Sequence, residues 1–91
     1  MKFENIAYLL GAYFHQDWFF DAPNSDDIVK SFIERESSAR VLALKQEITL
    51  LLLDDIELSS DFIANNNGYY DPTPDGLTVR EWFQNILKVL P

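Results

Sequence analysis

The sequence contains no cysteine among its 91 residues. Disulfide bonds and thiolate metal sites are therefore excluded, and packing alone must hold the chain together. Packing is feasible because 47% of the residues are hydrophobic and 14% are aromatic, which is typical of a folded globule and not of a disordered chain. A chain of this length is expected to form one domain over residues 1–91.

Basic residues are scarce. Seven Lys and Arg against fifteen Asp and Glu give a formal net charge of -8. This charge repels phosphate backbones and anionic lipid headgroups, so it argues against binding to nucleic acid or to membranes. The same charge would attract a basic protein, although solubility alone explains it equally well.

Long hydrophobic runs are also missing. The longest, residues 48–53, is interrupted by Thr49 and falls far short of the roughly 18 residues that a membrane-spanning helix needs. The apolar stretch at residues 6–11 is too short and too close to the N-terminus for a secretory signal. We therefore expect a cytoplasmic protein.

Apolar residues recur at helical spacing, and no run alternates with a period of two for long enough to be a convincing strand. The pattern predicts an all-α fold, a compact small bundle of about five short helices. The predicted helices cover about residues 3–14, 25–35, 39–53, 56–64 and 78–90. Between the first two, Pro23 indicates an ordered loop, which we expect Trp18, Phe19 and Phe20 to pack.

Capping signals mark several helix ends. Asn24 or Ser25 is a suitable N-cap, and Thr78 with Glu81 fits the capping-box pattern. The segment 65–68, Asn-Asn-Asn-Gly, favours a left-handed helix end. The third helix is expected to be central. Its predicted core face comprises Leu42, Leu44, Ile48, Leu51 and Leu52, with Lys45 and Glu47 facing away.

Catalytic chemistry has little support. His15, the single histidine, lies two residues before Asp17, and a carboxylate can orient an imidazole, but no cysteine nucleophile is present. We expect His15 to bind the last carbonyls of the first helix instead. Metal-ligand spacings and a glycine-rich phosphate loop are both absent, so neither a metal nor a cofactor is predicted.

Acidic residues occur next to aromatic residues in the second half of the chain. Tyrosine supplies contact area at small entropic cost, while carboxylates steer and pair with Arg and Lys. Solvated helix ends are the alternative interpretation of each cluster. The predicted partner-binding residues are Asp54, Asp55, Glu57, Asp61, Tyr69, Tyr70, Asp71 and Asp75. Asp17 and Asp21 form a further acidic pair in the first loop.

Three segments resemble the immunity proteins of bacterial contact-dependent growth inhibition systems. They are Gly11-Ala12-Tyr13-Phe14-His15-Gln16-Asp17-Trp18, residues 44–53, and Gly68-Tyr69-Tyr70 followed by Asp75-Gly76-Leu77-Thr78 and Glu81-Trp82-Phe83. Two positions depart from the family pattern, because Phe19-Phe20 replaces a more acidic continuation and Gly68 stands where a bulkier residue is expected.

The resemblance implies a cytoplasmic antidote that binds the toxic C-terminal domain of a neighbouring cell's surface protein, often a nuclease, and blocks its active site. A nuclease domain is typically basic, which suits an inhibitor with a charge of -8. The shared residues are then expected to be structural: Tyr13, Phe14, His15, Gln16, Asp17, Trp18, Glu81 and Trp82.

Two other functions remain open. The chain could be an acidic helical adaptor or regulatory module, homo-oligomeric through the aromatic residues of the 15–22 loop. It could also be a small hydrolase that uses His15 and a carboxylate. We do not expect an enzyme, and the immunity function is the preferred hypothesis.

Overall fold

Helices form the regular structure of the chain in the computed structural model, which describes residues 3–53 and 58–91. The elements are α1 (Glu4–Tyr8), the π-helical η1 (Leu9–Tyr13), α2 (Trp18–Asp21), α3 (Ser25–Arg35), α4 (Ser38–Leu53), α5 (Ser60–Asn65), the 3-10 helix η2 (Thr73–Asp75) and α6 (Val79–Val89). No strand occurs in the described ranges. The predicted all-α fold is confirmed.

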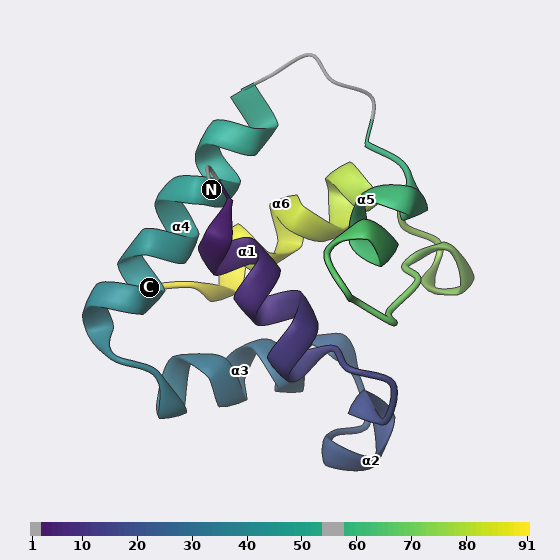
Figure 1. The fold of residues 1–91 in the computed structure, drawn as a ribbon, viewed down its shortest axis with the longest axis horizontal. Helices are drawn as coiled ribbons and strands as arrows, with labels where there is room; N and C mark the ends of the chain where they lie inside the picture. Colours follow the sequence, from purple (N-terminus) through teal and green to yellow (C-terminus); the bar gives the residue numbers. More distant parts are fainter. Residues whose placement is uncertain (1–2, 54–57) are drawn as a thin grey trace.

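The longest helix, α4, organises the others. It contacts α1, α3 and α6, and α3 in turn contacts α6 and η1. In Figure 1, α3 runs beneath α1, while α6 passes behind α1 and brings the C-terminus back to α4. That return is fixed by Lys45, whose Nζ donates a hydrogen bond to the carbonyl oxygen of Pro91 at 3.1 Å.

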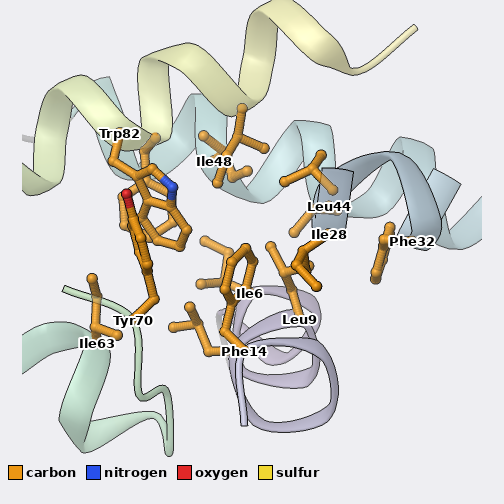
Figure 2. Close-up of a cluster of buried hydrophobic side chains, with 14 of the residues drawn as sticks. Ile6, Leu9, Phe14, Ile28, Phe32, Leu44, Ile48, Ile63, Tyr70 and Trp82 are labelled. Carbon is orange, nitrogen blue, oxygen red and sulfur yellow. The ribbon is translucent and has the colours of Figure 1, made fainter. Parts of the chain in front are cut away.

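The core lies where these helices meet. Figure 2 shows side chains from α1, α3, α4 and α6 converging with Ile63 and Tyr70. Trp82 is buried in this core, and its indole N–H has a hydrogen-bond partner there: Trp82 Nε1 donates to Ser25 Oγ at 2.7 Å. This bond ties α6 to the first turn of α3.

The helix ends follow the capping signals. Asn24, rather than Ser25, caps α3, since its side chain accepts from the N–H of Asp27 at 2.9 Å. The capping box of α6 is confirmed: Thr78 Oγ1 accepts from Glu81 N at 3.1 Å, and Glu81 Oε1 accepts from Thr78 N at 2.9 Å. The left-handed residue after α5 is Asn67, with φ of 67°.

The loop between the first two predicted helices contains α2 and does not bury all its aromatics. Trp18 is half-buried, with its ring centroid 5.9 Å from Phe14 and 5.4 Å from Tyr70. Phe19 and Phe20 are 56% and 77% exposed, so the expectation that they pack the loop is wrong. A helix of four residues can turn only one face to the core, and Trp18 takes that face.

The face of α4 differs from the prediction at two positions. Leu42 is 54% exposed, whereas Glu47 is 9% exposed and belongs to the buried side. The reason is α1: the Glu47 carboxylate accepts hydrogen bonds from the backbone N–H groups of Asn5 and Ile6, which satisfies two donors at the start of α1.

The region around α5 also differs in detail. This helix begins at Ser60 and not near residue 56, with Ser59 as its cap. Residues 54–57 lie outside the described ranges. After the helix, Gly68 packs so closely that an added Cβ would lie 2.6 Å from Ile63 Cγ2 and 3.2 Å from Leu10 Cβ. A bulkier residue does not fit here without displacement of the core.

Candidate functional site

The charges of this chain are unevenly distributed along the sequence. Residues 3–29 contain five carboxylates and residues 46–79 contain seven, and neither segment contains a single Lys or Arg. Along the sequence, the basic residues therefore lie outside the two segments that contain most of the acidic residues. A surface built from both segments would carry negative charge and no Lys or Arg of its own.

The fold places parts of these two segments side by side. The backbone N–H of Tyr69 donates to the carbonyl oxygen of Phe14 at 2.8 Å, and the rings of Trp18 and Tyr70 are 5.4 Å apart. In Figure 1, α2 and the loop that follows α5 lie on the right-hand side, away from the turn between α3 and α4. We call this surface the acidic edge. Its exposed residues are Asp17, Phe19, Phe20, Asp21, Asp26, Tyr69, Asp71 and Asp75.

His15 holds α2 at both ends. Its Nδ1 accepts a hydrogen bond from the backbone N–H of Asp17 at 3.1 Å, and its Nε2 lies 2.9 Å from Oδ2 of Asp21. Because Nδ1 accepts, the proton of the neutral ring is on Nε2 and is donated to Asp21. The expected bond to the last carbonyls of the first helix is replaced by this bridge, and the paired carboxylate is Asp21 and not Asp17.

A hollow of about 220 Å³ opens between the start of α3 and the loop before α6. Asp26 and Asp75 line it, together with Tyr70 and Trp82. The Tyr70 hydroxyl donates to Asp75 Oδ2 at 2.6 Å, and burial, reinforced by this bond, raises the pKa of Tyr70. The hollow is below the usual size of a small-molecule pocket but large enough for one basic side chain.

No group of three or more His, Asp or Glu side chains in residues 3–53 and 58–91 is arranged to hold a metal ion. Over the same residues, every helix is too short or too polar to cross a bilayer.

Comparison with known proteins now gives the family. The model of the CdiI immunity protein family matches residues 2–90. The chain belongs to this family. The resemblance to immunity proteins of contact-dependent growth inhibition systems is thereby confirmed.

One chain of a solved complex has the same fold. One chain in the crystal structure of the CdiA-CT/CdiI complex from Y. kristensenii 33638 superposes with a TM-score of 0.88, over 100% of both chains, at 23% sequence identity. At this identity the likeness concerns the fold alone. No curated protein matches the sequence.

In this member of the CdiI family, the predicted partner-binding residues that the structure describes have different environments. Asp61 lies exposed in the first turn of α5, and Tyr69 is 63% exposed. Asp71 is exposed, and its Oδ1 accepts from the N–H of Thr73 at 2.9 Å, which lowers the pKa of its carboxyl. Asp54, Asp55 and Glu57 lie outside the described residues.

Tyr70 has a different place from its neighbour Tyr69. Its side chain is 5% exposed and packs in the core, with its ring 5.6 Å from Phe14 and 4.9 Å from Trp82. It also lines the hollow, where its hydroxyl donates to Asp75. We therefore do not carry the Tyr70 ring into the proposed contact surface.

The family-motif residues lie in several different environments. Phe14 and Trp82 are buried, Tyr13, His15 and Trp18 are half-buried, Gln16 and Asp17 are exposed, and Glu81 completes the capping box of α6. Asp17 is the N-cap residue of α2, but its side chain makes no capping hydrogen bond. The structural role of this set stays a prediction.

Tyr13 belongs to a second polar cluster, at the turn between α3 and α4. The hydroxyls of Tyr8 and Tyr13 both donate to Glu36 Oε2, and Arg40 Nε lies 3.4 Å from Oε1. Burial, together with the bond to Glu36, raises the pKa of Tyr13 to about 12. The bond from Tyr13 lowers the pKa of Glu36. This cluster fastens η1 to the turn that leads into α4.

Phe19, Phe20 and Asp26 are absent from the predicted partner-binding residues. A carboxylate in the first turn of a helix gives no signal of a contact surface. The exposure of the two phenylalanines could not be read from a segment too short to have a helical period.

Proposed function

We propose that this chain binds and neutralises the toxic C-terminal domain of a contact-dependent growth inhibition effector. The observation that carries the proposal is membership of the CdiI immunity protein family over residues 2–90. The similar chain from Y. kristensenii 33638 occurs in a complex with CdiA-CT, and we carry that kind of partner over to this protein.

We further propose that the acidic edge is the contact surface and that the toxin domain is a basic nuclease whose active site it occludes. A nuclease binds phosphates through Lys and Arg, so a row of carboxylates can replace the nucleic acid in its cleft. The charge distribution supports this, because the edge contains five exposed carboxylates and its two segments contain no cation. The hollow between Asp26 and Asp75 is suited to an Arg or Lys of the toxin.

In this proposal the protein acts in the cytoplasm as an inhibitor and not as an enzyme. His15 then has a positioning role, since both of its ring nitrogens are engaged with α2. Its replacement with alanine should loosen α2 without removing any catalytic turnover.

The first test is binding to the C-terminal domain encoded immediately upstream of this gene. Size exclusion and calorimetry should give a one-to-one complex, and co-expression should restore growth of cells that produce the toxin domain. Absence of both binding and protection would contradict the proposal and favour the adaptor hypothesis.

A charge-matched pair of variants tests the contact surface. Asp26→Lys reverses a charge on the acidic edge, whereas Glu34→Lys makes the same change on exposed α3 surface about 12 Å further along the helix. We expect Asp26→Lys to slow association about tenfold at low ionic strength and the control to have a much smaller effect. Equal rates for the two variants would exclude the edge as the docking surface.

A further inference from the structure

Two phenylalanines project from the acidic edge into solvent. Phe19 and Phe20 are 56% and 77% exposed, and their ring centroids are 4.5 Å apart. Exposed apolar residues that occur singly need no explanation, but an adjacent aromatic pair presents one continuous apolar surface. We call this pair the aromatic finger.

Contacts on both sides of the finger position its backbone. Trp18, which precedes it, packs against Phe14 and Tyr70. His15 bonds to the backbone at one end of α2 and to the Asp21 carboxylate at the other. Since these contacts already order the backbone, binding would mainly have to order the two Phe side chains, which lowers the entropic cost of using them as an anchor.

The charges around the finger indicate the occupant of this surface. In the sequence, Asp17 and Asp21 lie on either side of Phe19 and Phe20, and Asp26 follows in the first turn of α3; all three carboxylates are exposed. A second copy of this chain would bring the same carboxylates together, and like charges oppose that contact. A partner with an apolar pocket and a rim of Lys and Arg would instead pair with both the rings and the carboxylates.

We propose that the aromatic finger is the anchor through which this chain binds its toxin domain. The two rings enter an apolar pocket on the toxin, and the neighbouring carboxylates pair with its basic rim. This inference rests on the proposed function and adds to it the residues that anchor the contact. Buried aromatic anchors within a charged rim dominate the energetics of many protein interfaces.

The test is the double variant Phe19→Ala/Phe20→Ala, with Leu42→Ala/Leu50→Ala as its matched control. All four side chains are about half exposed or more, so neither variant should unfold the protein, and circular dichroism checks this. Calorimetry with the cognate toxin domain should give a dissociation constant at least about a hundredfold higher for the finger variant, mostly through faster dissociation. The control should stay within about threefold.

The outcomes separate this inference from the proposed function. If the unmodified protein binds the toxin and the finger variant binds as tightly, the inference is wrong and the proposed function stands. If both double variants weaken binding equally, the finger is no special anchor. If the unmodified protein fails to bind, the proposed function falls, and the inference falls with it. Sedimentation of the free protein tests self-association: a dimer that is lost in the finger variant while toxin binding is unchanged would overturn the inference.

Discussion

Glu47 provides the sharpest test of how this fold is held together. Its carboxylate reaches from α4 to the start of α1, where Oε1 accepts from Asn5 N at 2.8 Å and from Ile6 N at 3.0 Å. The amide side chain of Asn5 donates to the other oxygen. One buried residue therefore acts as the N-terminal cap of a helix that lies 41 residues away in sequence.

The cost of Glu47→Ala follows from these contacts. Three donors would lose a charged acceptor: the backbone N–H groups of Asn5 and Ile6 and the side-chain amide of Asn5. Each group that stays unsatisfied costs about 1 to 3 kcal/mol. Water can reach part of the site, because Asn5 is only half-buried, so we expect a total near the lower end, about 3 kcal/mol.

Urea unfolding followed by circular dichroism measures this change. The midpoint should fall with the slope unchanged, and the melting temperature should drop by about 15 °C. Gln46→Ala is the control, since Gln46 is the exposed neighbour on the same helix and should cost no more than about 0.5 kcal/mol. A loss of less than about 1 kcal/mol for Glu47→Ala would refute the capping role.

Two further predictions concern stability. Gly68→Ala should lower the free energy of unfolding by about 1 to 3 kcal/mol, because the added Cβ would lie 2.6 Å from Ile63. Gly11→Ala is the control, since the nearest atom to its added Cβ is 3.7 Å away. In the same urea assay it should be neutral or slightly stabilising. Tyr13 has a folded pKa of about 12 against an ordinary 10.0, so its contribution to stability is complete below pH 10 and is lost as the pH rises through 12. In Tyr13→Phe the loss of stability at alkaline pH should be smaller. The pKa of the Glu36 carboxyl, measured by NMR titration, should rise towards its ordinary value in this variant. An unchanged Glu36 pKa would contradict the hydrogen bond from Tyr13.

The helices of this chain could be predicted because their signals are local. The capping box of Thr78 and Glu81 and the Asn24 cap involve residues three positions apart, and both occur as expected. The buried position of Glu47 could not be predicted, because a carboxylate in a leucine-rich helix is expected at the surface unless a buried hydrogen-bond donor is known to face it. That partner is the start of α1, and only the tertiary packing of α1 on α4 brings the two together.

The candidate site was predicted less completely, for the same physical reason. The acidic clusters are visible in the sequence, but the contact between the loop of Tyr69 and the segment of Phe14 joins residues 55 positions apart. Tyr69 and Tyr70 are adjacent residues of the same type, yet only Tyr69 is exposed. The choice between them is made by Phe14 and Trp82, which provide a pocket for one ring.

The acidic edge and the aromatic core beneath it have different tolerances to change. Tyr70 and Trp82 are packed against each other and against Phe14, so a smaller residue at either position would cost several kcal/mol and disturb the backbone of the edge. Phe20 and Tyr69 project into solvent, where substitution typically changes stability by about 0.5 kcal/mol or less. These exposed residues can therefore be exchanged while the core beneath them stays packed. This arrangement would allow an immunity protein to acquire a new toxin partner without refolding its core.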